Sequence, residues 1–75
     1  MLVKLETASW GPNEQIVGTG QIAVNAHHIM YVRPETPEYT TVTLITGYEQ
    51  IVRAPYDELV RLVRLMSSMR EETSQ

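Results

Sequence analysis

Apolar residues recur at helical spacing near the C-terminus, and this periodicity limits what the chain can fold into more than any other feature. The i, i+3, i+4, i+7 pattern is typical of an amphipathic helix with one apolar face. That face comprises Leu59, Leu62, Val63, Met66 and Met69. Asp57 and Glu58 suit the positive end of a helix dipole at its start. The sequence therefore predicts one helix over residues 56–69.

The apolar arc of this helix is wider than a small sheet requires. Val60 and Leu65 extend it on both sides, to over half the circumference, whereas a stripe of about 100° is enough to cover a core. Either the helix is sunk deep in the core, or its flank packs on a partner or a second copy. We favour the second interpretation. It makes Val60, Arg61, Arg64 and Leu65 candidate partner-binding residues.

The segments before the helix read as strands separated by turns. Alternating or β-branched residues predict strands over 2–7, 15–18, 21–25, 29–33, 39–45 and 48–53, with a break or bulge at Thr19-Gly20. Proline, glycine and asparagine mark the turns. The fold class is therefore α+β: a small antiparallel sheet of four to five strands closed by one C-terminal amphipathic helix. We expect a single domain over 1–70 and a polar, frayed tail over 71–75.

Size, cysteine content and charge restrict the protein further. A chain of 75 residues without cysteine can use neither disulfides nor thiolate metal sites. No signal peptide and no membrane-spanning run are visible, so we expect a cytoplasmic protein without a membrane partner. The net charge of −3 disfavours a general phosphate binder.

No catalytic or metal-binding pattern emerges from the sequence. His27 and His28 are adjacent, so their side chains diverge and cannot easily bind one ion. Ser9, His28 and Asp57 lack the context of a catalytic triad. The glycines around Thr19 lack the rest of a phosphate-binding motif. We expect no enzyme, no cofactor, no metal and no small-molecule substrate.

Nucleic-acid binding is the main alternative to protein binding. Tyr31, Tyr39 and Tyr48 could stack on bases, with Arg33 and Arg53 reaching phosphates. Tyrosine is also a favoured strand residue, so these positions could serve the sheet alone. The net charge and the lack of a recognition-helix pattern favour the latter.

Trp10 lies beside a Gly-Pro turn. It either covers the core or, if exposed, anchors a partner, since tryptophan is enriched among interface hot spots. We include Trp10 among the candidate partner-binding residues.

The chain resembles the FlbD family of small flagellar and swarming accessory proteins over residues 24–63. Four stretches carry this resemblance: 24–29 (valine-asparagine, turn, isoleucine), the threonine-rich strand 41–47 ending in glycine, the return strand 51–53 and the acidic helix start 57–60. LytTR-type DNA-binding domains share this sequence pattern. Residues 9–20 look like an insertion relative to the family, and the loop 34–38 is unusually rich in proline. The resemblance implies a small cytoplasmic regulator acting through protein contacts.

Together these observations predict a non-enzymatic regulatory or interaction module of bacterial or phage origin, acting through protein–protein contacts and forming a homo-oligomer or joining a larger assembly. A phage-type regulator that docks on host transcription machinery and a small nucleic-acid-binding sheet domain are the alternatives.

Overall fold

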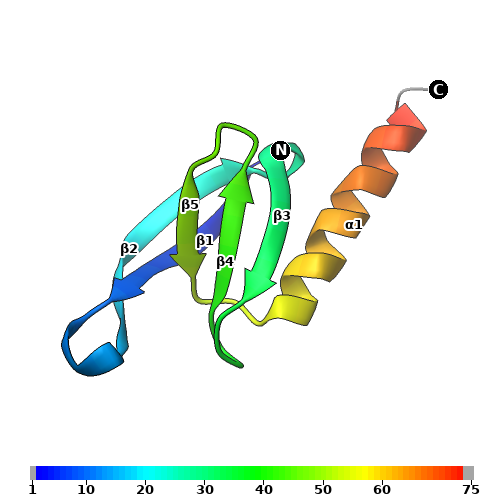
Figure 1. Ribbon diagram of the computed structural model, residues 1–75. Helices are drawn as coiled ribbons and strands as arrows, with labels where there is room; N and C mark the ends of the chain where they lie inside the picture. The colour runs from blue at the N-terminus through cyan, green and yellow to red at the C-terminus, as the bar shows by residue number, and fades with distance from the viewer. Residues whose placement is uncertain (1, 74–75) are drawn as a thin grey trace.

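The computed structural model describes residues 2–73, and the side chains of residues 2–66 (Figure 1). These residues form a five-stranded sheet, two short 3-10 turns and one helix, which confirms the predicted α+β class. In chain order the elements are β1 (Leu2–Trp10), η1 (Pro12–Glu14), β2 (Ile16–Asn25), η2 (Ala26–His28), β3 (Ile29–Pro34), β4 (Thr40–Leu44), β5 (Glu49–Val52) and α1 (Tyr56–Thr73).

The sheet is antiparallel throughout, and its strand order is β2-β1-β5-β4-β3. The first strand therefore lies between the second and the last. The edge strands β2 and β3 are joined by the three residues of η2 alone. Because so short a link cannot cross a flat sheet of five strands about 4.8 Å apart, the sheet must curve so that one end of β2 approaches β3.

The predicted break at Thr19-Gly20 is a β-bulge inside one long strand. Thr7 pairs with Gly20 and Ala8 pairs with Gly18, which leaves Thr19 as the extra residue. The hydroxyls of Thr7 and Thr19 lie 2.8 Å apart and form a hydrogen bond across the bulge. The two strands expected over 15–18 and 21–25 are therefore the continuous β2, because a bulge adds a residue without ending the ladder.

The hydrophobic core lies between the sheet and the first turns of α1. It draws one residue from each of four strands and one from the helix: Leu5, Val24, Val42, Val52 and Leu59. Val52 and Leu59 are almost completely buried. The core thus joins four of the five strands and the first turns of α1 into one cluster.

Helix α1 packs against one side of the sheet, where it contacts β3 and η2 (Figure 1). Asn25 Oδ1 accepts a hydrogen bond from the backbone N–H of His27 at 3.0 Å and so caps η2. The His27 ring then reaches the helix, with Nε2 lying 3.2 Å from the carbonyl oxygen of Met66. The η2 turn therefore both connects the edge strands and holds α1.

The helix is longer than the sequence predicted. It runs to Thr73, whereas the apolar periodicity predicted an end at residue 69. The apolar periodicity ends at residue 69, but the polar residues that follow are compatible with a helical backbone. The expected tail 71–75 thus begins inside α1, and its last two residues lie outside the described part of the chain. No helix within residues 2–73 is long and apolar enough to cross a bilayer.

Candidate functional site

Four of the predicted partner-binding residues share the solvent side of α1. Leu59 faces the core and is 2% exposed, whereas Leu65 is 55% exposed. Arg61 and Arg64 are exposed and Val60 is half-buried. We call the residues on this side the outer face of α1: Asp57, Val60, Arg61, Arg64 and Leu65.

The outer face results from the helical period. At about 100° per residue, Asp57, Val60 and the two arginines lie within about 100° of one another, and Leu65 borders this arc. The sheet covers the opposite side, where the helix meets β3 and η2. The wide apolar arc predicted from the sequence is therefore partly uncovered in the fold.

Trp10 lies on a different part of the molecule. It ends β1 at the far tip of the β1–β2 hairpin, and Figure 1 shows this tip and α1 on opposite sides of the sheet. The Trp10 side chain is 54% exposed and lies outside the core cluster, so it does not cover the core. The structure does not bring Trp10 together with the outer face of α1.

Trp10 borders a cleft that the sequence did not predict. The cleft has a volume of about 530 Å³ and lies between the hairpin tip and the loop that connects β3 with β4. Its lining residues are Trp10, Glu14, Gln15, Ile16, Thr36, Pro37, Glu38 and Tyr39. We call it the Trp10 cleft. Only the prolines of the loop and the exposed Trp10 hinted at it, because its two walls are 20 or more residues apart in the sequence.

The three tyrosines do not form one stacking surface. Tyr39 immediately precedes β4 and lines the Trp10 cleft, whereas Tyr48 immediately precedes β5 and lies at the opposite end of β4. Tyr31 is on the edge strand β3, opposite Thr43. Tyr39 thus lies at one end of β4, whereas Tyr31 and Tyr48 lie near the other, which leaves the nucleic-acid hypothesis without a stacking platform made of all three.

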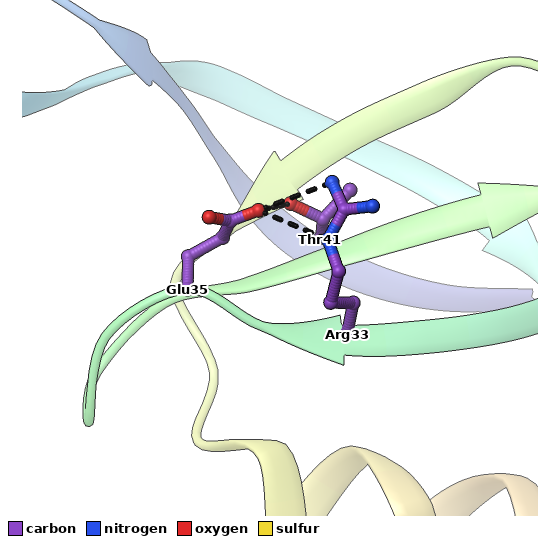
Figure 2. Close-up of polar contacts among 3 residues, drawn as sticks. All are labelled: Arg33, Glu35 and Thr41. Carbon is purple, nitrogen blue, oxygen red and sulfur yellow. Dashed lines mark hydrogen bonds and ion pairs between the residues drawn. The ribbon is translucent and has the colours of Figure 1, made fainter.

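Arg33, Glu35 and Thr41 form a polar cluster at the start of the β3–β4 loop (Figure 2). Glu35 Oε1 accepts a hydrogen bond from the Thr41 hydroxyl at 2.7 Å. The same oxygen forms an ion pair with the Arg33 guanidinium at 3.3 Å. The Thr41 hydrogen bond, helped by the Arg33 hydrogen bond and charge, lowers the pKa of Glu35 below its ordinary value, against a smaller opposing effect of burial. The cluster fixes the end of the loop that forms one wall of the Trp10 cleft.

Replacing Thr41 by valine should raise the pKa of Glu35, because the hydroxyl is the main group that stabilises the carboxylate. Since folding lowers this pKa, Glu35 stabilises the protein above its unfolded-state pKa, and this contribution is lost as the pH falls through the folded pKa. The pKa is read from the Glu35 side-chain carbonyl shift in an NMR titration. An unchanged titration in the Thr41→Val variant would show that the charge of Arg33 dominates instead.

The two histidines have structural surroundings. His27 bridges η2 and α1, and His28 is exposed at the end of η2, where its carbonyl oxygen accepts a hydrogen bond from the N–H of Ile45 at 2.8 Å. Within residues 2–73, no group of three or more His, Cys, Asp or Glu side chains is arranged to hold a metal ion.

Comparison with known proteins places this chain in a family. No curated protein and no solved structure shows significant similarity to it. The family model for flagellar and swarming motility proteins, FlbD, matches residues 17–69. This match includes the stretch 24–63 that carried the resemblance in the sequence and extends it at both ends, while all of β1, including Trp10, precedes it. The match covers more than half of the chain, which therefore belongs to the FlbD family of flagellar and swarming motility proteins.

Proposed function

We propose that this protein is a non-enzymatic cytoplasmic module that regulates a flagellar or swarming system through protein–protein contacts made by the outer face of α1. The observation that carries the proposal is the contrast along one helix. Leu59 is 2% exposed, whereas Leu65, less than two turns further along the helix, is 55% exposed. In the sequence, Leu65 lies between Arg61 and the polar end of the chain.

The residues on this face combine the features of a contact surface. Leu65 and the half-buried Val60 offer apolar area, which stabilises a complex by about 25 cal/mol for each Å² removed from water. Arg61 and Arg64 lie between them on the helix, and arginine is enriched at protein interfaces. A function of this kind needs no residues that bind a cofactor, a metal or a small molecule.

The charge pattern of the face fits a second copy of the chain. If two copies of α1 pair antiparallel about a two-fold axis between Val60 and Arg61, Asp57 of each copy faces Arg64 of the other. Because the pairing is isologous, this contact is made twice. Asp57 and Arg64 are both exposed in the single chain. Opposite charges therefore meet twice.

One helix pair is a small interface. Stable complexes bury about 1,200–2,000 Å² in total, and a contact of about three helical turns covers less than this. We therefore expect a weak dimer whose population rises over micromolar protein concentrations. A larger flagellar partner could use the same face with a larger area.

The test compares two kinds of substitution by sedimentation equilibrium at a series of protein concentrations. The Val60→Glu, Leu65→Glu variant should stay folded by circular dichroism and lose self-association. Unfolding of this variant would instead assign both residues to the core.

Charge reversal identifies the partner as a second copy. Asp57→Arg and Arg64→Asp should each weaken self-association by about tenfold or more, since each places like charges opposite one another twice. A mixture of the two variants should associate again, because all facing charges are then opposite. Glu49→Gln, on the far side of the sheet, is the matched control. If the mixture associates no better than either variant alone, the antiparallel pairing is wrong.

A further inference from the structure

The Trp10 cleft has walls made by two segments that the sheet holds in place. One wall is the hairpin tip, which is closed by a hydrogen bond from the N–H of Gly11 to the carbonyl oxygen of Gln15. The other is the loop before β4, where Thr36 makes backbone hydrogen bonds with Tyr39 in both directions at 3.1 and 3.3 Å. The Thr36 hydroxyl also accepts from the N–H groups of Glu38 and Tyr39.

These bonds give the cleft a defined shape before any ligand arrives. A preformed site avoids much of the ordering cost of binding, so more of the contact energy appears as affinity. A cavity of about 530 Å³ is within the range of roughly 300–1,000 Å³ typical of ligand sites.

The chemistry of the lining favours a cationic ligand with an apolar backbone. Four lining residues are apolar or aromatic: Trp10, Ile16, Pro37 and Tyr39. Two are carboxylates, Glu14 and Glu38, and no lysine or arginine lines the cleft. Among the described residues, neither carboxylate has an ion-pair partner, whereas Glu35 beside the cleft is held by Arg33.

Trp10 offers an exposed aromatic face next to these carboxylates. A guanidinium stacks well on tryptophan and pairs with carboxylates at the same time. Glu14 lies at a left-handed backbone position, with φ 57°, which is rare for glutamate and marks a locally constrained residue. It borders Trp10 in two adjoining cavities.

The shape indicates an extended segment of polypeptide. The cleft is open and bounded by aromatic and proline side chains, the kind of surface on which proline-containing segments in the polyproline II conformation dock. The acidic net charge of the chain also attracts a cationic segment at long range.

We propose that the Trp10 cleft binds an extended, arginine- and proline-containing segment of a protein partner, with an arginine placed between Trp10 and the carboxylates of Glu14 and Glu38. This site is separate from the outer face of α1, so the two proposals stand or fall independently.

Trp10 is the single tryptophan of the chain, so its fluorescence reports on the cleft directly. The full chain is titrated with a capped peptide that alternates arginine and proline. The matched peptides replace arginine by glutamate, or proline by glycine. We expect a saturable change in Trp10 emission with the arginine–proline peptide, a weaker one with the arginine–glycine peptide, and none with the glutamate–proline peptide.

The acidic residues are tested in the same assay. The Glu14→Gln, Glu38→Gln variant should bind the arginine–proline peptide about tenfold more weakly and with a smaller dependence on salt. Glu58→Gln on α1, which makes the same chemical change outside the cleft lining, should bind like the wild type.

Three outcomes would overturn the proposal. The first is no response to any peptide, and the second is equal binding of the arginine and glutamate peptides. The third is a response to arginine amide or spermidine as strong as that to the peptide, which would assign the cleft to a small cation. Because the peptide comparison uses the wild-type chain, it decides the question even if the double variant fails to fold.

Discussion

Replacing Leu59 by alanine is expected to lower the free energy of unfolding by about 2–5 kcal/mol. Among the α1 residues whose side chains the structure describes, Leu59 is the only one in the buried core cluster, where it joins Val42 and Val52. Removing most of its side chain leaves a cavity at the point where α1 meets the sheet. Folded domains are typically stable by only about 5–15 kcal/mol, so a loss of this size is a large share of the total for 75 residues.

Leu65→Ala is the matched control, because it makes the same chemical change six residues along the same helix. Leu65 is 55% exposed, so we expect a change within about 0.5 kcal/mol. Urea unfolding followed by far-ultraviolet circular dichroism measures both values. Equal losses for the two variants would mean that the end of α1 is buried as deeply as its start, and the outer face would then not be free for a partner.

Replacing Thr40 by valine should cost about 1–3 kcal/mol, although valine has nearly the same shape as threonine. Thr40 is completely buried, and its hydroxyl donates a hydrogen bond to the carbonyl oxygen of Ala54 at 2.7 Å. Ala54 lies in the short link between β5 and α1. The substitution leaves this carbonyl without its partner and loosens the connection that directs the helix onto the sheet.

Thr43→Val provides the comparison on the same strand. Thr43 is also buried, but within the described residues its hydroxyl has no hydrogen-bond partner. Valine should therefore be neutral or stabilising there, since it removes a buried polar group that gains nothing. Thermal unfolding of both variants is the measurement. A similar loss at the two positions would show that the hydrogen bond to Ala54 contributes little.

The sequence predicts the elements of this fold well, because each has a local cause. The threonine-rich run gives β4, the bulge residue Thr19 lies beside two glycines, and the acidic first turn gives α1. The order of the strands has no local cause. Whether β1 pairs with β5 depends on contacts between residues more than 40 positions apart, such as Thr7 with Val52.

The same reason limits prediction of the candidate sites. The outer face of α1 follows from helical period within one element, so Val60, Arg61, Arg64 and Leu65 could be named in advance. The Trp10 cleft requires two distant segments to meet. Sequence reasoning identified Trp10 as a candidate, but Glu38 and Tyr39 became its neighbours only through the pairing of the strands.

The place of β1 between β2 and β5 has a consequence for synthesis of the chain. The β1–β2 hairpin can form early on the ribosome, but its other edge stays open until β5 has left the exit tunnel. The seam that then joins the two halves is short, with Thr7 and Ala8 paired to Val52 and Ile51. It has one further backbone bond, from the N–H of Arg53 to the carbonyl oxygen of Glu6, and one side-chain bond, from the Gln50 amide to the carbonyl oxygen of Ala8. Closing so long a loop for so few bonds is slow relative to local folding. The sheet of the nascent protein therefore stays incomplete until β5 has been made and has left the tunnel.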